Sequence, residues 1–332
     1  MSAMNAAASP AISVVVRSMD RPVLARALAS IAAQDARGID AEVLVVAACG
    51  PSHRAVAPSI GPWSARLVAG DGALSRPRAA NAGLDAARGR CITFLDDDDE
   101  LLPDQFSSLL AELDADPAAD FVHARSIAVG ADGQPLYVYG GPWIAWRQLS
   151  HGFFQLGAVM LRRELIGRGV RFDESLDILE DLEFFVQCAQ VARFRYLARP
   201  VSRYHITEGT SGTGEGGNRN AERLRRALDY IRGKWSDLAR ELEASPPARL
   251  DRAREAIHRG EFAAALETLA PLVEATPPDV NALNLSSVAR IHLGDFDRAQ
   301  ELLARALTLL PGNPGLLENV ALLERKRAAA AR

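Results

Sequence analysis

Cysteine is scarce in this chain: 332 residues contain three, Cys49, Cys91 and Cys188, and no two of them form a C-x-x-C pair. This spacing excludes a disulfide framework and the common zinc-binding patterns. We therefore expect all three thiols to be reduced and mostly buried, as in proteins of a reducing compartment. This use of cysteine predicts a cytoplasmic location.

The sequence also lacks an excess of positive charge and a long apolar run. Its formal net charge is −4 and its pI is about 5.9, which argues against a general nucleic-acid-binding protein. No stretch is apolar for long enough to cross a bilayer, so we predict no transmembrane segment; peripheral contact with the inner membrane stays open. Residues 1–10 lack the charged start and apolar middle of a signal peptide, and we predict a disordered tail there.

What the first half does contain is an alternation of strand-like and helical patterns. Short apolar runs, as expected for buried strands, occur at 11–17, 42–48, 65–68 and 91–95. Helical patterns occur between and after them, at 23–34, 77–88 and 103–114. The alternation predicts an α/β fold with a parallel, Rossmann-like sheet and helices on both faces.

Beyond this alternation the pattern becomes mixed, with strand-like runs around a helical stretch at 180–191. We predict one α/β domain over residues 11–210. A segment rich in glycine and serine follows at 209–218, and its composition predicts a flexible linker, because no strand precedes it as a phosphate-binding glycine loop requires. Residues 211–244 should then hold this linker and one amphipathic helix at 221–242.

The C-terminal region repeats itself. The tripeptide Gly-Glu-Phe at 260–262 recurs as Gly-Asp-Phe at 294–296, and Pro277 recurs as Pro311, each at an offset of 34 residues. A helix–turn–helix unit of this length, with glycine and proline at fixed places, is typical of tetratricopeptide repeats. We predict an all-helical, tetratricopeptide-like region over 245–332 that binds a protein partner.

Four consecutive aspartates, Asp96, Asp97, Asp98 and Asp99, follow the strand predicted at 91–95. Ligands bind at the carboxyl ends of the strands in open α/β sheets, so this run lies where a site is expected. Adjacent carboxylates repel one another, and a divalent cation such as Mn²⁺ or Mg²⁺ relieves that repulsion through hard oxygen ligands. The alternative explanation is an acidic start to the next helix.

Four segments together resemble the family 2 glycosyltransferases of the GT-A fold. They are AISVVVRSMDRPVLARALASIAAQ, RAANAGLDAARGRCITFLDDDDELLPDQF, FFQLGAVMLRREL and ILEDLEFFVQ. The second is the most specific, because a helix, a strand, a D-x-D-D element and L-x-P-D follow one another in it. The resemblance covers residues 11–210. It implies a metal-dependent, inverting enzyme that moves a sugar from a nucleoside-diphosphate sugar to an acceptor hydroxyl on a bacterial glycan, a lipid-linked glycan or a protein.

The resemblance also assigns roles to the acidic residues. Asp98 would bind the metal, Asp96 would face the ribose or the metal shell, and Asp97 belongs to the same donor-binding element, with Asp99 in support. Asp181 matches the general base of the inverting members, although a solvated helix start is the alternative explanation. In-line displacement at the anomeric carbon needs both a neutralised leaving diphosphate and a base for the acceptor hydroxyl.

Other residues are expected near the site, the first two below from the resemblance and the other arginines and the tryptophans from their position and chemistry. They are His205 and Arg203 for the metal or the diphosphate, Asn81, Arg76 and Arg78 for the donor, and Trp143 and Trp146 for stacking on an acceptor sugar. Each type also has an ordinary structural use, since lone histidines and aromatic residues most often serve packing.

The chain departs from the family after the second strand. The family usually has an acidic pair there that accepts a hydrogen bond from the nucleobase, whereas this chain has Ala47-Ala48. The identity of the nucleotide therefore stays open, and we assign Asp20 as the nearest replacement. The departure favours an alternative function, a catalytically weak scaffold that binds partners through its repeats. A nucleotidyltransferase is a third hypothesis, but the segment at 17–22 lacks the glycine-rich loop that it needs.

Overall fold

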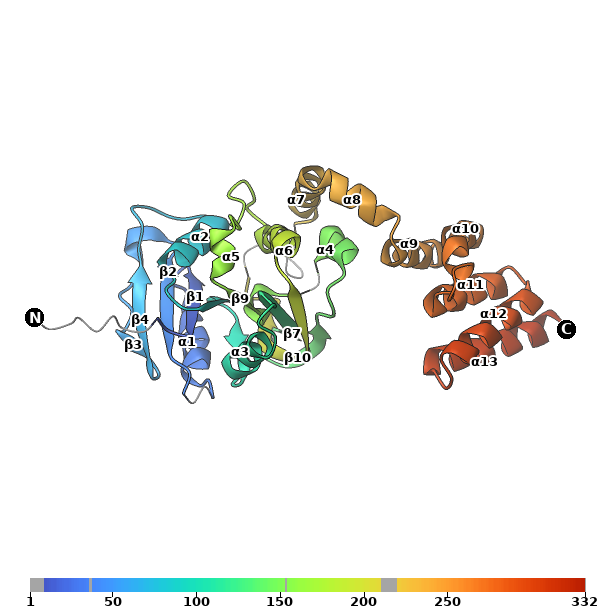
Figure 1. Ribbon diagram of the computed structural model, residues 1–332, viewed down its shortest axis with the longest axis horizontal. Helices are drawn as coiled ribbons and strands as arrows, with labels where there is room; N and C mark the ends of the chain where they lie inside the picture. Colours follow the sequence, from blue (N-terminus) through green and yellow to red (C-terminus); the bar gives the residue numbers. More distant parts are fainter. Residues whose placement is uncertain (1–8, 36–37, 153, 210–219, 332) are drawn as a thin grey trace, which may run out of the picture. The chain divides into compact units, whose positions relative to one another are not determined.

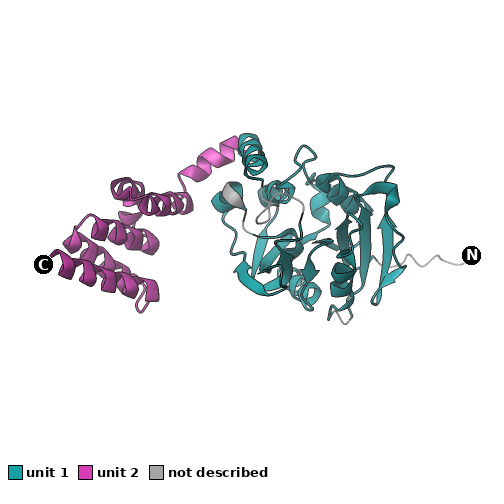
Figure 2. Ribbon diagram, turned by 180° about the vertical axis from the view of Figure 1, so that it is seen from behind, with its two compact units in different colours: residues 1–234 teal, residues 235–332 magenta. Residues whose placement is uncertain are grey.

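The computed structural model describes residues 9–35, 38–152, 154–209 and 220–331. The chain divides into two compact units, residues 1–234 and residues 235–332 (Figure 2). The glycine- and serine-rich linker predicted at 209–218 lies almost wholly outside the described residues, as does most of the predicted N-terminal tail. The predicted domain boundaries stay predictions.

Within the described residues of the first unit, ten strands form one sheet in the order β3-β4-β2-β1-β5-β9-β7-β10-β6, with β8 paired to β7 (Figure 1). The strands are β1 Ile12–Ser18, β2 Ala41–Ala47, β3 Ser59–Ile60, β4 Trp63–Val68, β5 Cys91–Asp96, β6 Glu100–Leu101, β7 Phe121–Val129, β8 Pro135–Tyr139, β9 Val159–Arg162 and β10 Phe194–His205. Parallel pairing joins β4, β2, β1 and β5, which are the four strands that the sequence predicts in the first half.

Helices cover both faces of this sheet, as predicted. Alternate residues of β1 point to opposite faces: Val14 and Val16 pack with helices α1 (Leu24–Ala32) and α3 (Gln105–Ala115). Val15 packs on the other face with α2 (Arg76–Ala86) and α6 (Glu180–Val191). The remaining helices of this unit are α4 Ala145–His151, α5 Glu164–Gly167, α7 Ala221–Lys234 and the short 3₁₀ turns Gly50–Ser52 and Leu156–Ala158.

One feature of the sheet differs from the prediction of a parallel sheet. Strand β9 lies between β5 and β7 and is antiparallel to both, so the sheet is mixed. Three of its four residues, Val159, Met160 and Leu161, are apolar and buried, and a short apolar run carries no signal of strand direction. The long strand β10 contains the two strand-like runs that follow the helical stretch at 180–191. Its pairing with β7 is irregular around Pro200, where the two runs meet.

Close packing explains why glycine stands at two positions, 83 and 89, of the segment that leads into the aspartate run. A Cβ at Gly83 would overlap Cγ1 of Val15, and a Cβ at Gly89 would lie 2.5 Å from the backbone nitrogen of Ser13. The absence of a side chain therefore lets helix α2 and the turn after it approach strand β1 closely.

The second unit is helical throughout its described part. Its helices are α8 Ser236–Glu243, α9 Pro246–His258, α10 Phe262–Val273, α11 Val280–His292, α12 Phe296–Leu309 and α13 Pro314–Ala330. Helices α9 and α11 begin 34 residues apart, and so do α10 and α12. Gly260 and Gly294 precede the second helix of each pair with φ values of +78° and +79°, which glycine adopts without strain. The sequence period is thus also a structural period.

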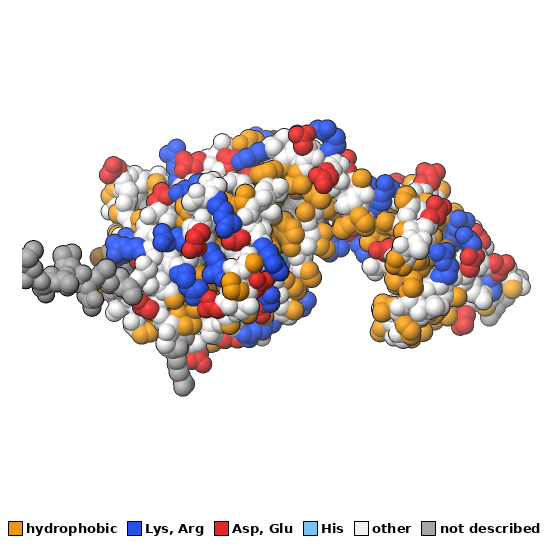
Figure 3. All heavy atoms as spheres, viewed as in Figure 1, with side chains coloured by type: hydrophobic (Ala, Val, Ile, Leu, Met, Phe, Trp, Pro, Cys, Tyr) orange, Lys and Arg blue, Asp and Glu red, His pale blue; other side chains and the backbone are white. Residues whose placement is uncertain are grey.

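The single helix predicted at 221–242 is wrong, because α7 ends at Lys234 and α8 begins at Ser236. Trp235 between them has non-helical dihedral angles, φ −106° and ψ 33°, and Gly233 just before it is a poor helix former. No described helix combines the length and the apolar character that crossing a bilayer requires. On the face drawn in Figure 3, basic and acidic side chains of the first unit are interspersed.

Candidate active site

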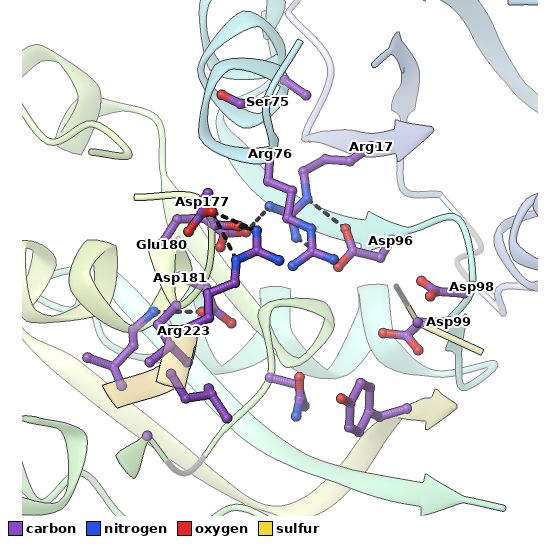
Figure 4. A pocket seen from close by; sticks show the side chains of 18 of the residues that line it. Arg17, Ser75, Arg76, Asp96, Asp98, Asp99, Asp177, Glu180, Asp181 and Arg223 are labelled. Carbon is purple, nitrogen blue, oxygen red and sulfur yellow. Dashed lines mark hydrogen bonds and ion pairs between the residues drawn. The ribbon is translucent and has the colours of Figure 1, made fainter. Parts of the chain in front are cut away.

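The carboxyl ends of β1 and β5 open into a cavity of about 820 Å³. Arg17 of β1 and Asp96 of β5 are register partners there, and the remaining aspartates of the run follow in the next turn. The N-terminus of α6, with Glu180 and Asp181, also lines the cavity. Figure 4 shows these two acidic groups on opposite sides, with the arginine side chains between them. The volume is that of an ordinary ligand site.

Arg17 connects the two sides of the cavity. Its Nε and Nη2 atoms donate to both carboxylate oxygens of Asp96, at 2.6 and 2.7 Å, and its Nη1 donates to Oε1 of Glu180 at 2.6 Å. The side chains of Arg17 and Glu180 are only 8% and 4% exposed. Burial works to raise the pKa of Asp96, but the charge and hydrogen bonds of Arg17 outweigh it and lower that pKa.

Asp97 is not part of the cluster that the other three aspartates form, although Arg21 pairs with both Asp97 and Asp98. Its carboxylate is buried, accepts a hydrogen bond from the backbone nitrogen of Met19 at 2.8 Å and pairs with Arg21. These contacts hold the turn after β5 against the turn after β1. The predicted donor-binding residue therefore has its oxygens engaged within the protein.

Asp96, Asp98 and Asp99 offer carboxylate oxygens that all lie within 4.8 Å of one another. Burial and the neighbouring carboxylates raise the pKa of Asp98, and the same causes raise that of Asp99 well above its usual value. Asp99 accepts a hydrogen bond from the backbone nitrogen of His205 at 3.0 Å. These three carboxylates repel one another, and their clustered oxygen atoms are suitable ligands for a hard divalent cation.

Asp181 stands at the first turn of α6, on the other side of the cavity. The residue before this helix, Leu179, has a positive φ of 60°, and the helix starts abruptly after it. Oδ1 of Asp181 accepts a hydrogen bond from the backbone nitrogen of Leu182 at 2.8 Å. Burial and then the charge of Glu180 raise the pKa of Asp181 to about 7. A carboxyl group with such a pKa can exchange a proton near neutral pH.

Several predicted site residues are not brought to this cavity. The amide of Asn81 exchanges hydrogen bonds of 3.0 Å with the backbone of Phe172, and Arg78 pairs with Glu174 at 3.0 Å. Asp20 is held by Arg54 through its backbone nitrogen and Nε, which leaves the Ala47-Ala48 departure without a carboxylate in its place. None of these predicted donor contacts lines the cavity.

His205 also turns from the aspartates, because its Nε2 lies 2.7 Å from Oε1 of Glu100. Trp143 packs against Phe154 and Phe194, and neither it nor Trp146 lines the cavity. Arg76 does line it and points toward Asp96, whose pKa its charge helps to lower (Figure 4).

Two parts of the site are not predicted from the sequence. Arg17 is predicted only as the end of a buried strand, although a charge in such a run needs a buried partner and is therefore a usable signal. Helix α7 was predicted as a connection, yet Arg223, Leu228 and Arg232 line the cavity. Arg223 pairs with Asp177 at 2.9 Å, which attaches α7 beside α6, and nothing in its sequence pattern indicates that contact.

Comparisons with known proteins agree with this architecture. Residues 13–166 match the model of glycosyl transferase family 2. The succinoglycan biosynthesis protein ExoO of Rhizobium meliloti (strain 1021) is 32% identical over 205 residues, which are 56% of this chain and 58% of that protein. The amylovoran biosynthesis glycosyltransferase AmsB of Erwinia amylovora is 28% identical over 151 residues, 42% of this chain and 50% of that protein. The chain thus spans about half the length of these relatives.

A solved structure, S. aureus TarS 1-349, matches with a TM-score of 0.49 and 14% identity, over 95% of this chain and 80% of that one. The family match agrees, over residues 13–166, with the resemblance to family 2 glycosyltransferases seen in the sequence. The mixed sheet and the position of the aspartate run at the end of β5 are compatible with this match.

Proposed function

We propose that the chain is a metal-dependent, inverting glycosyltransferase that moves a sugar from a nucleoside-diphosphate sugar to an acceptor hydroxyl. The observation that carries this proposal is the arrangement of the cavity, where the group Asp96, Asp98 and Asp99 faces Asp181 from the opposite side. The cluster of Asp96, Asp98 and Asp99 suits a departing diphosphate and its cation. Asp181 suits an acceptor hydroxyl that loses its proton.

On the leaving side, Asp98 and Asp99 with Asp96 would hold Mn²⁺ or Mg²⁺, which neutralises charge on the diphosphate when it is bound. Arg76 lines the same part of the cavity and supplies a planar cation for a phosphate oxygen. Arg17 keeps the Asp96 carboxylate in place and ionised, since its guanidinium contacts both oxygens.

On the attacking side, Asp181 is the proposed general base. Its pKa of about 7 lets it take a proton from an acceptor hydroxyl at neutral pH. A single attack from this side, opposite the leaving group, inverts the anomeric configuration. Glu180 stays with Arg17 and supports Asp181 by keeping the first turn of α6 in position.

The nucleobase would meet an apolar wall. Ala48, Leu74 and Met19 line the cavity near the ends of β1 and β2, and Asp20 is bound elsewhere. We infer that the base is held by packing and backbone groups in place of a carboxylate. The nucleotide selectivity should therefore be broader than that of an enzyme with an acidic pair.

The acceptor is proposed to be a glycan of bacterial polysaccharide synthesis, since the names of two relatives refer to the synthesis of succinoglycan and amylovoran. We further propose that the chain acts in the cytoplasm and that its 34-residue units, of tetratricopeptide type, bind a protein partner.

The test is a screen of UDP-glucose, UDP-galactose, UDP-N-acetylglucosamine and GDP-mannose for turnover with Mn²⁺, with Mg²⁺ and with a chelator. Turnover should require the cation, and NMR of the product should show an inverted anomeric centre. The Asp98→Asn variant should weaken Mn²⁺ binding at least tenfold, whereas Asp132→Asn, in a surface turn, should not. A folded protein that binds no nucleoside diphosphate would instead support the scaffold function.

A further inference from the structure

Gln148 lines the cavity, and its buried side-chain amide has no hydrogen-bond partner among the described residues. It lies on α4, its side chain is 1% exposed, and within the described part of the chain neither Nε2 nor Oε1 has a partner. Its backbone is satisfied, because its nitrogen bonds to the Ile144 oxygen and its oxygen accepts from Gly152. Only the polar atoms of the side chain therefore lack a partner among the described residues, and Gln148 lines the cavity.

The position of α4 places this amide on the side of the proposed base. Helix α4 packs against α6, and a Cβ at Gly152 would lie only 3.3 Å from Cδ1 of Leu182, the neighbour of Asp181. The residues that line the cavity with Gln148 include the aromatic and apolar side chains of Tyr139, Phe154 and Leu182. A few polar groups in an otherwise apolar wall are what fix the orientation of a ligand.

The chemistry of the amide narrows what it can bind. Its NH₂ donates and its carbonyl oxygen accepts, so a partner that does both satisfies it fully. A sugar hydroxyl is such a partner, whereas a phosphate only accepts and would leave the carbonyl oxygen unpaired. Two of the cations that line the cavity, Arg17 and Arg76, lie close to Asp96, whereas Arg223 on the side of Asp181 is already paired with Asp177 at 2.9 Å (Figure 4).

We propose that Gln148 is a specificity-determining residue that binds a sugar hydroxyl beside Asp181. The inference rests on the proposed glycosyl transfer and adds the group that recognises the sugar. A buried amide that is paired only by substrate discriminates strongly against a sugar that lacks the hydroxyl, because the amide then stays buried and unpaired.

The test compares the wild-type chain with Gln148→Met, which keeps the length of the side chain and removes the amide. The control is Gln190→Met, on the exposed end of α6, where the amide donates to the backbone oxygen of Val186 of its own helix at 3.2 Å. Kd is measured for the tightest-binding sugar nucleotide of the four-member panel and for its bare nucleoside diphosphate. Thermal unfolding is measured for all three proteins.

If the hydroxyl belongs to the donor sugar, Gln148→Met weakens the sugar nucleotide about tenfold and leaves the nucleoside diphosphate unchanged. If it belongs to the acceptor, both Kd values are unchanged, and KM for a methyl glycoside acceptor rises about tenfold while donor hydrolysis persists. In either case Tm stays equal or rises, because an unpaired buried amide has been removed. The deoxy analogue that lacks the recognised hydroxyl should bind wild type and variant alike.

Unchanged Kd and KM values in the variant would overturn the assignment of Gln148 and leave the proposed function intact. A lower Tm for Gln148→Met than for Gln190→Met would also overturn it, since the amide would then have a partner within the protein. Should the variant not fold, Gln148→Asn, which withdraws the amide by one methylene, must show the same selective loss. Failure of the wild type to bind any sugar nucleotide would refute both proposals.

Discussion

Arg17 and Glu180 lie 163 residues apart in the chain, yet their side chains form a buried ion pair of 2.6 Å. The same guanidinium contacts both oxygens of Asp96, so one residue joins the end of β5 to the start of α6. The two chemical sides of the cavity are thus fixed to each other through a single charged group.

Replacing Arg17 should cost much more stability than replacing an exposed arginine in a similar pair. Arg17→Met leaves Asp96 and Glu180 without their cation, and the loss of one partner of a buried pair lowers the free energy of unfolding by about 3–5 kcal/mol. Arg90→Met is the control, because its pair with Asp114 has side chains 41% and 48% exposed. That pair should contribute about 0–1 kcal/mol. Urea unfolding of both variants measures the difference, and equal small losses would contradict it.

The transfer rate should rise with pH through about 7. Asp181 is protonated below its raised pKa and cannot then accept a proton, so activity appears as the carboxylate forms. Asp181→Asn should lower the transfer rate about 10²–10⁴-fold and abolish this rise, while nucleoside diphosphate binding persists. Rates measured from pH 5 to pH 9 under saturating donor check the prediction. A pH profile that Asp181→Asn retains unchanged would assign the titration to another group.

The stability of the protein should depend on Asp181 in the opposite sense. Its pKa is about 7 in the folded protein against an ordinary 3.8, so between these pH values the folded chain binds a proton that the unfolded chain has released. The contribution of this group to stability therefore falls as pH rises from 4 to 7. Asp181→Asn should be more stable than wild type at pH 8, and the gap should close toward pH 4. Unfolding of both proteins at the two pH values tests this.

A methyl group at Gly83 should strain the fold without touching the site. In Gly83→Ala the new Cβ meets Val15 of β1, and overpacking of this kind costs about 1–3 kcal/mol. Gly233→Ala is the matched control, since nothing lies within 4 Å of its added Cβ in helix α7. The control should be neutral or more stable by up to about 1 kcal/mol. Denaturant midpoints of the two variants compare them, and equal midpoints would contradict the packing argument.

The parts of the structure that could be predicted from sequence are those with a local cause. Apolar runs buried on both faces locate β1, β2 and β5, and the aspartates follow β5 at the edge where ligands bind. Strand direction in β9 has no such local signal, because its partners β5 and β7 are chosen by the tertiary fold. The break at Trp235 was also missed, because the apolar spacing continues on both sides of it.

The site residues also differ in how far the sequence predicts them. Asp96 and Asp181 are predicted from their motifs and line the cavity. Asn81 and Arg78 stand in the same segment as Asp96, but they bind Phe172 and Glu174. Membership in a motif does not distinguish a residue that holds the motif together from one that meets the ligand. That distinction depends on which face of α2 each residue occupies, and a helix of small residues such as alanine leaves the face unspecified.

Helix α7 sets the shortest useful length of this domain. The family match ends at residue 166, and the mixed strands end at His205, yet Arg223, Leu228 and Arg232 complete the wall of the cavity. A protein truncated after residue 210 would retain every aspartate discussed above and still have its cavity open on one side. Activity measured on such a fragment would report on the catalytic groups without the surface that encloses their substrates, so truncation studies of this domain should extend through Lys234.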